Sequence, residues 1–169
     1  REEVKVNSFR KNGDTLYLRF YNIPLLAGRN LAHSDTVKEF LINEELLHRL
    51  GFEKPEDALG EEVTYNKKKI PIIGVVRNFH MKSLHEKIEP VMIANEMNDF
   101  TCLNIRLSNV EGESLQAGIE KIQGAWKKIY PDAPLDYHFL DETIKNFYRT
   151  EQRISKLIST ATGLAIFIS

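Results

Sequence analysis

The residues best suited to chemistry lie in the segment from Phe79 to Glu86, which carries two histidines, a serine and a glutamate. His80 and His85 are not one helical turn apart, which is the spacing that a zinc site on a single helix requires. Ser83 lies between them, but neighbouring residues of an extended segment point in different directions and no nucleophile-elbow motif surrounds this serine. The spacing predicts neither a metal site nor a local catalytic serine, and only a triad assembled in space stays open.

The other candidate groups are isolated from one another. Each remaining histidine falls on its own predicted element, and the two acidic pairs are typical of a strand edge and of a helix N-terminus. Single glycines do not form a phosphate-binding loop. The one cysteine lies in a strand-like run, which predicts a small buried residue and excludes an internal disulfide. These positions are His33, His48, His138, Glu61, Glu62, Asp141, Glu142, Gly28, Gly74 and Cys102. We therefore predict no catalytic, cofactor-binding or metal-ligating residue.

Charge and length narrow the class of protein. The 169 residues include 23 Lys plus Arg against 24 Asp plus Glu, a formal net charge of −1. Nucleic-acid binding needs a basic face, and nothing in this balance indicates one. With 42% hydrophobic residues, the chain can form one domain or two small lobes that bury ~70% of their extended surface. We expect a core that needs neither a metal nor a disulfide.

The elements that must position these groups begin with an ambiguous N-terminal stretch. Asn12-Gly13 favours a hairpin between strands at residues 4–9 and 16–20, because apolar residues alternate in the second segment. Asp14 could instead cap a short helix in the second segment. The alternation favours the two strands.

The centre of the chain predicts one short helix among several strands. Asn43 and the two glutamates after it supply a cap and an acidic first turn for a helix over residues 44–50, which Gly51 ends. A charged turn at 66–69 joins two strands, and the second is apolar along nearly its whole length, which is typical of a central strand. Pro71 should lie at its entry, where a missing N–H donor is tolerated. The predicted strands span 38–42, 62–65, 70–76 and 90–94, after a connection at 24–30 in which Gly28 can take a left-handed turn.

An amphipathic helix over residues 113–130 is the clearest element of the second half, because its apolar residues recur at helical spacing. Strand-like runs flank it at 101–107 and 135–140. The resulting order of strands and helices predicts an α+β fold with small mixed or antiparallel sheets, not a repeating parallel fold.

The last part of the chain loses every charge after Lys156. Residues 157–169 are fewer than the ~20 apolar residues that span a bilayer, so this run is a buried terminal helix or a membrane helix cut at the bilayer surface. Helical spacing from Ile144 to Ile168 favours the second alternative, and at ~1.5 Å per residue a helix from residue 141 to 169 would extend about 40 Å. Its basic residues could reach lipid headgroups or form a solvated face, and both remain open: Lys145, Arg149, Arg153 and Lys156. Because the chain also starts without a methionine or a signal segment, we expect a module excised from a membrane protein.

Three groups of motifs occur in a distinctive order. The first is Ile23-Pro-Leu-Leu-Ala-Gly-Arg-Asn-Leu31, followed by Phe40-Leu-Ile-Asn-Glu44, Leu50-Gly-Phe52 and Leu59-Gly-Glu61. The second is Ile72-Ile-Gly-Val-Val-Arg-Asn-Phe-His80 with Ser83-Leu-His85 and Pro90. The third runs from Trp126 and Tyr130-Pro131 through Phe139-Leu-Asp141 and Tyr148 into the apolar terminus. In this order and spacing they resemble the extracytoplasmic domain of MacB/FtsX-like ABC transporter permeases.

The resemblance implies a two-lobed periplasmic domain on a long stalk helix. Residues 1–32 and 97–140 would form the membrane-proximal, porter-like lobe, and residues 33–96 the inserted, sabre-like lobe. Residues 141–169 would be the stalk that enters a truncated transmembrane segment. Its packing residues would be Ile144, Phe147, Tyr148, Ile154, Leu157 and Ile158.

The resemblance also implies partners and a location. The module would lie on the periplasmic side of the cell inner membrane, joined to the remaining transmembrane part of the same polypeptide. Its partners would be a second permease copy, a cytoplasmic ATP-binding subunit, and a periplasmic adaptor or an outer-membrane channel. Without a catalytic site or a cofactor of its own, it would couple ATP hydrolysis to export, including efflux, or to mechanical signalling.

Two other classes stay open on the sequence. An extracytoplasmic ligand-sensing module of a membrane receptor predicts an enclosed apolar pocket with convergent polar groups. A soluble hydrolase predicts a histidine hydrogen-bonded to Ser83 or to a carboxylate.

Overall fold

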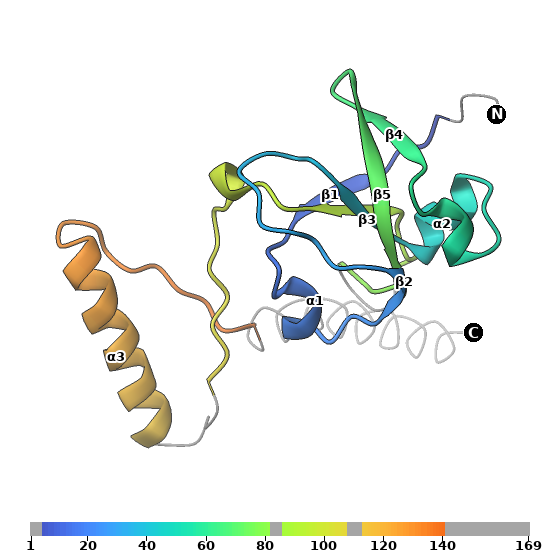
Figure 1. The fold of residues 1–169 in the computed structure, drawn as a ribbon. Helices are drawn as coiled ribbons and strands as arrows, with labels where there is room; N and C mark the ends of the chain where they lie inside the picture. Colours follow the sequence, from blue (N-terminus) through green and yellow to red (C-terminus); the bar gives the residue numbers. More distant parts are fainter. Residues whose placement is uncertain (1–4, 82–85, 108–112, 141–169) are drawn as a thin grey trace, which may run out of the picture. The chain divides into compact units, whose positions relative to one another are not determined.

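The computed structural model describes residues 5–81, 86–107 and 113–140. The chain divides into two compact units, Arg1–Leu103 and Asn104–Ser169. Among the described residues, the first unit combines a sheet with short helices and the second contains one longer helix (Figure 1). The α-helices of the described residues are α1 (Tyr17–Phe20), α2 (Glu44–Arg49) and α3 (Glu113–Ile129), with short 3-10 helices at Pro55–Ala58 and Met97–Asp99. The predicted α+β class is confirmed, while the predicted stalk helix lies outside the described residues.

A six-stranded sheet forms the centre of the first unit. Its main path runs through β1 (Phe9–Asn12), β6 (Val91–Ala94), β3 (Phe40–Asn43), β5 (Lys68–Val76) and β2 (Leu25–Gly28), and β4 (Glu62–Tyr65) pairs with β5 off this path. The pairs β1–β6 and β3–β5 are parallel. The pairs β2–β5, β3–β6 and β4–β5 are antiparallel. The sheet is therefore mixed.

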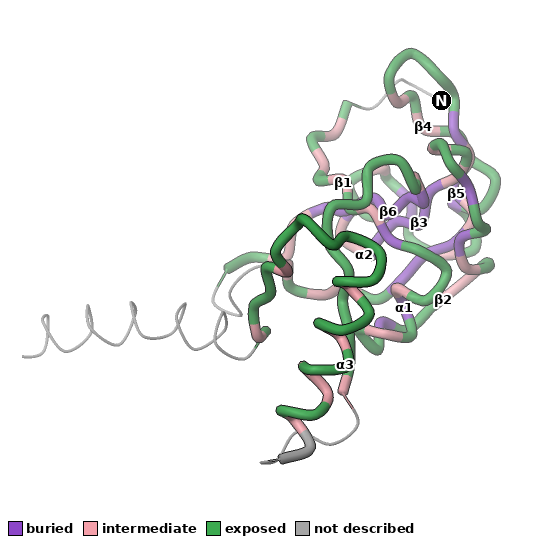
Figure 2. Tube along the Cα trace, turned by 90° about the vertical axis from the view of Figure 1, so that its left-hand side faces the viewer, coloured by how far each residue is buried: buried purple, intermediate pink, exposed green. Residues whose placement is uncertain are grey.

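Each face of this sheet carries its own hydrophobic core, because successive side chains of a strand point to opposite faces. Phe40 and Ile42 of β3 join the cluster that contains Leu46 of α2. Leu41, between them in the chain, joins the cluster that contains Leu18 of α1. Figure 2 shows the buried residues concentrated along β3, β5 and β6. The two short helices thus cover apolar side chains from opposite faces of the sheet.

The predicted central strand and its hairpin are present, but β5 begins at Lys68 and the predicted place of Pro71 at its entry is wrong. β5 pairs with β2, β3 and β4, and the turn after β4 has positive φ at Asn66 (49°) and Lys67 (65°), as a tight hairpin turn requires. Pro71 lies opposite Glu62 inside β5, not at its entry. It precedes Ile72, where the pairing with β3 begins, so its missing N–H removes no bond to that strand.

The predicted N-terminal hairpin is wrong. Residues 9–12 form β1, but the following segment forms α1, and β1 pairs with the distant β6. Neither Asn12 nor Gly13 has the positive φ of a two-residue hairpin turn; instead the Gly13 N–H donates to the Ala94 carbonyl at 2.9 Å. The alternative of a short helix in this segment is confirmed, but Asp14 is not its cap: the N-cap of α1 is Leu16, without a side-chain cap bond, and Asp14 Oδ1 accepts from the Leu16 N–H at 2.9 Å in the turn before the helix.

Three further segments differ from the predictions. The expected connection at 24–30 contains β2, which pairs with β5. The expected strands at 101–107 and 135–140 form no strand in the described structure. Their apolar residues alternate, but among the described residues neither has a partner strand, and Leu103 is 81% exposed. The prediction of strands at these two strand-like runs is therefore wrong.

The amphipathic helix of the second unit is confirmed as α3. Its apolar residues Leu115, Ile119, Ile122 and Trp126 are half-buried, whereas Ile129 is 69% exposed. Leu107 lies beside Gly118, where an added Cβ would come within 3.3 Å of the leucine side chain. Leu107 thus covers part of the apolar face of α3.

The predicted lobe boundaries at 32/33 and 96/97 remain a prediction. The sheet of the first unit takes β1 and β2 from residues 1–32 and its other strands from residues 33–96. Across residues 5–81, 86–107 and 113–140, no helix combines the length and apolar character that a membrane crossing needs.

Candidate functional site

Residues of the first two motif groups lie close together at the end of β3, around Asn43. This side chain is fully buried, and its Oδ1 accepts from the N–H of Leu46 at 3.1 Å and of Val91 at 2.9 Å. Its Nδ2 donates to the carbonyl of Glu89 at 2.8 Å. One amide therefore caps α2, as predicted, and also fixes the start of β6 on both sides of Pro90.

A second asparagine holds the loop after β5 against the same helix end. Asn78 Oδ1 accepts from the Glu45 N–H at 2.9 Å, and the Asn78 N–H donates to Glu44 Oε2 at 2.8 Å. The Arg77 N–H donates to the Pro24 carbonyl at 2.9 Å. Asn78 thus forms hydrogen bonds to a backbone N–H and a carboxylate in the first turn of α2. These bonds hold the loop that leads to His80 against the start of the helix.

Residues of the first motif also hold β2 and the segment after it in place. Gly28 has φ +80°, and a Cβ there would lie 2.2 Å from the Ile73 carbonyl oxygen. Arg29 makes two hydrogen bonds to Glu39, at 3.1 and 2.5 Å, and Glu39 also accepts from the Ala32 N–H at 2.7 Å. The hydrogen bond from Arg29, helped by the Ala32 N–H, lowers the pKa of Glu39 although burial opposes the shift.

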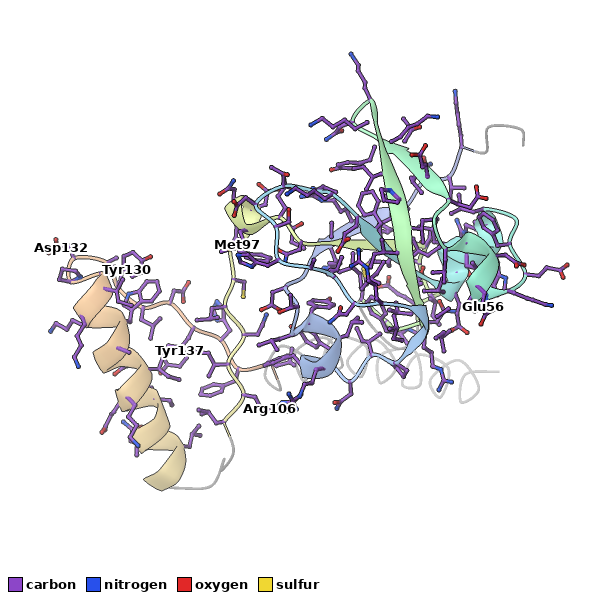
Figure 3. All side chains as sticks on the ribbon, viewed as in Figure 1. Glu56, Met97, Arg106, Tyr130, Asp132 and Tyr137 are labelled. Atoms are coloured by element: carbon purple, nitrogen blue, oxygen red, sulfur yellow. The ribbon has the colours of Figure 1, made fainter. Side chains whose placement is uncertain are left out.

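The third motif closes a turn within the second unit. The Trp126 Nε1–H donates to the Ala133 carbonyl at 2.9 Å, and the Trp126 and Tyr130 rings lie 4.6 Å apart. In Figure 3, Tyr130 and Asp132 lie at the end of α3, where the chain reverses. This motif therefore shapes the exit of a helix.

A charged cluster links β1 to the 3-10 helix after β6. Arg10 contacts Glu96 at 2.6 Å and Asp99 at 2.7 Å. Its guanidinium also lies 5.6 Å from the centre of the Tyr65 ring. Burial opposes a rise in the Arg10 pKa, but the two carboxylates outweigh it and the pKa is raised. Arg10 is therefore held as a cation in a fixed position, with no proton to exchange near neutral pH.

The sequence-selected reactive residues do not come together in the described structure. His80 and His33 are exposed. His48 Nδ1 lies 3.2 Å from the Phe52 carbonyl, and His138 lies 3.8 Å from Asp136 with both side chains more than four-fifths exposed. Among residues 5–81, 86–107 and 113–140 no three His, Cys, Asp or Glu side chains cluster as a metal site would require. Ser83, His85, Asp141 and Glu142 lie outside the described residues, as do the stalk residues Ile144, Phe147, Tyr148, Ile154, Leu157 and Ile158.

The prediction for Cys102 is wrong, because the residue is exposed. Its segment forms no strand in the described structure, so the burial expected from strand pairing does not follow.

Two tyrosines of the first unit have raised pKa values. The rings of Tyr17 and Tyr21 contact each other at a tilted angle, with ring centres 4.9 Å apart. Burial raises the pKa of Tyr17 to about 12, and burial with the Cys102 charge raises that of Tyr21. Both phenols remain neutral at physiological pH.

Sequence reasoning identified Asn43 as a helix cap but missed its role at β6, and it missed Asn78 altogether. The signal for Asn78 was its place directly after a buried strand, where an amide can satisfy backbone groups of a neighbouring element. Locating its partner requires knowing that β3 and β5 are adjacent and parallel. The residues that define the motifs thus pair with one another and with backbone groups.

The chain matches no family model and no curated protein. Its fold is similar to the crystal structure of the periplasmic region of MacB from Actinobacillus actinomycetemcomitans, with a TM-score of 0.53 and 17% sequence identity over 80% of this chain and 62% of that one. A domain of a protein from Porphyromonas gingivalis described as a permease aligns with a TM-score of 0.48 and 18% identity, over 80% of this chain and 70% of that one. This chain thus spans 62% of the length of the MacB structure. The mixed sheet with its short helices and the alignment with the MacB structure agree. We conclude that the chain has the α+β fold of the MacB periplasmic region.

Proposed function

We propose that this chain is the extracytoplasmic part of an ABC-type permease. The observation that carries the proposal is the fold similarity to the MacB periplasmic region, with a TM-score of 0.53 over 80% of the chain. The order of the sequence motifs gives independent support, since they were recognised from residues alone.

In this proposal the module works as a rigid transmitter. The motif residues lock strands, helix ends and loops to one another: Asn43 fixes β6, Asn78 fixes the loop after β5, and Glu39 holds Arg29. A body stiffened in this way passes on a displacement instead of absorbing it. No reactive side chain is needed, because the ATP would be hydrolysed by a cytoplasmic subunit.

The remaining parts of the machine follow from the same proposal. Residues 141–169 would form the stalk that connects the module to the bilayer of the cell inner membrane. The lobes would comprise residues 1–32 with 97–140, and residues 33–96. A second permease copy, the ATP-binding subunit and a periplasmic adaptor or outer-membrane channel would be the partners, and the output would be export, including efflux, or mechanical signalling.

Charge substitutions on the proposed stalk test the proposed function. Ile154→Lys and Leu157→Lys, made in the full-length protein, place a charge on the proposed packing face. We expect transport or ATPase coupling to fall at least tenfold while the protein still reaches the membrane and its sheet unit still unfolds cooperatively.

The matched control is Gln152→Lys, which adds the same charge at a polar position of the same segment. It should retain most of the coupling. Full coupling in Ile154→Lys and Leu157→Lys, or an equal loss in Gln152→Lys, would reject the proposed stalk.

A further inference from the structure

The hairpin of β4 and β5 projects from the first unit. Within the part of the chain that the structure describes, β4 pairs with β5 alone, from Glu62 opposite Pro71 to Tyr65 opposite Lys68. The pairing of β5 with β3 starts only at Ile72. Figure 1 shows this two-stranded ribbon extending beyond the other strands. Its end, here called the lysine tip, consists of Asn66, Lys67, Lys68 and Lys69. The tip is therefore presented away from the core.

The end of β4 next to the lysine tip is anchored through the Tyr65 side chain. The Tyr65 ring meets the fully buried Phe40 edge to face, with ring centres 5.6 Å apart. Arg10 covers the same tyrosine at 5.6 Å and is itself held by Glu96 and Asp99. These contacts join the last residue of β4 to β1, β3 and the segment after β6. The lysine tip is thus pre-organised, which lowers the entropy lost when it binds.

The charge of the tip is largely uncompensated. Among the described residues, neither Lys67 nor Lys68 has an acidic partner. Lys69 lies 3.6 Å from Glu62, but both side chains are more than half exposed, so water screens this pair. Lys67 also adopts a left-handed backbone conformation with φ 65°, which glycine or asparagine would adopt more readily. In a chain with a net charge of −1, the tip is a local concentration of positive charge.

We propose that the lysine tip is an electrostatic docking finger for a carboxylate-rich surface of a partner protein. A membrane surface fits less well, because electrostatic membrane binding uses clusters of about four to eight basic residues or adds apolar side chains that insert. The tip offers neither: Tyr65 is packed on Phe40, and the next apolar residue, Ile70, is only 4% exposed. Lysine supplies compact point charges that suit carboxylates without a fixed fork geometry.

This role is independent of the proposed function. Exposed charges at the rim of an interface act mainly on the rate of association and on its salt dependence. The tip should therefore raise the rate of association with the partner. This effect should weaken as the salt concentration rises and the Debye length falls to about 3 Å. The ribbon, anchored at Tyr65, would set the orientation of the partner.

Carbodiimide coupling tests the proposal, since it joins a lysine amine to a carboxylate only where the two are in contact. In intact cells that carry the full-length protein, we expect peptides that join Lys69 to an aspartate or glutamate of a second, sequenced protein. Lys67→Glu with Lys68→Glu should lower the yield of these Lys69 peptides about tenfold. Lys67→Arg with Lys68→Arg keeps the charge and should keep the yield.

The control is Lys38→Glu with Lys54→Glu, which changes the net charge equally at two exposed lysines elsewhere and should leave the yield unchanged. The proposal is overturned if Lys69 couples to no second protein, or if its yield is insensitive to Lys67→Glu with Lys68→Glu. It is also overturned if sedimentation with phosphatidylglycerol vesicles depends on the tip as strongly as the coupling does, which would assign the tip to a membrane.

Discussion

At the scale of single residues, Asn43 at the end of β3 joins α2 to the start of β6. It bonds to the Leu46 and Val91 N–H groups and to the Glu89 carbonyl from a fully buried position. Asn43→Ala removes the cap of α2, at a cost of about 1 kcal/mol, and leaves a buried N–H unpaired, at about 1–3 kcal/mol. We expect the free energy of unfolding in urea to fall by about 3 kcal/mol.

The control for Asn43 is Asn98→Ala. Asn98 is exposed and makes one long hydrogen bond, 3.3 Å to the Asp35 carbonyl, so its loss should cost no more than about 0.5 kcal/mol. Equal losses in the two variants would show that the Asn43 network adds nothing beyond an ordinary surface amide.

The pair of Arg29 and Glu39 predicts a dependence of stability on pH. Because Arg29 lowers the pKa of folded Glu39 below its ordinary 4.5, the pair stabilises the fold above that pH and loses this contribution as the pH falls through the lowered pKa. Arg29 is 58% exposed, so solvent screening limits the effect to about 0.5–1 kcal/mol. The difference in unfolding free energy between wild type and Arg29→Gln should therefore be about that size at pH 7 and shrink as the pH falls below 4.5 through the lowered pKa.

Arg49→Gln is the matched variant, because Arg49 contacts Glu45 one helical turn away on the surface of α2. Its cost at pH 7 should stay within about 0.5 kcal/mol. A difference for Arg29→Gln that persists undiminished at pH 2 would contradict the assignment to Glu39.

At the scale of elements, the close contact of β2 with β5 depends on Gly28. Gly28→Ala would place a Cβ 2.2 Å from the Ile73 carbonyl oxygen while keeping φ at +80°. We expect a loss of about 3–4 kcal/mol, combining the left-handed penalty with displacement of a backbone strand. Chemical denaturation with a constant m-value measures it.

Gly51→Ala separates the two causes. Gly51 has φ +82°, but a Cβ there meets nothing within 4 Å. It should cost only the conformational term, about 1–2 kcal/mol. If both glycine variants lose the same amount, the approach of β2 to β5 is looser than described.

Local signals predicted those elements that are fixed by local chemistry. The cap at Asn43, the stop at Gly51, the turn at Asn66 and the amphipathic α3 all follow from nearby residues, and all were predicted. The N-terminal hairpin failed because β1 pairs with β6, some eighty positions later in the chain. A strand partner at that distance leaves no trace in the local alternation that the prediction used.

At the scale of the whole molecule, the fold class was predicted from the sequence, but the structural role of the motif residues was not. They were expected to mark a family, and in the structure they hold β3, β5, β6 and α2 together. The geometry of Asn78 and Glu44 arises only when β3 and β5 lie side by side. The lysine tip was visible in the sequence as a charged turn, yet its projection depends on where the pairing of β5 with β3 begins.

The central claim, that this module lies outside the cytoplasm, is tested most directly by labelling Cys102. This cysteine is exposed and is the only one in these 169 residues. In spheroplasts that carry the full-length protein, the labelling by a membrane-impermeant maleimide that is lost in Cys102→Ser therefore reports on the side of the membrane where Cys102 lies. The account predicts that Cys102 is labelled before lysis, at least tenfold more than in Cys102→Ser. Labelling of Cys102 only after the membrane is broken would place the module in the cytoplasm and contradict the proposed function.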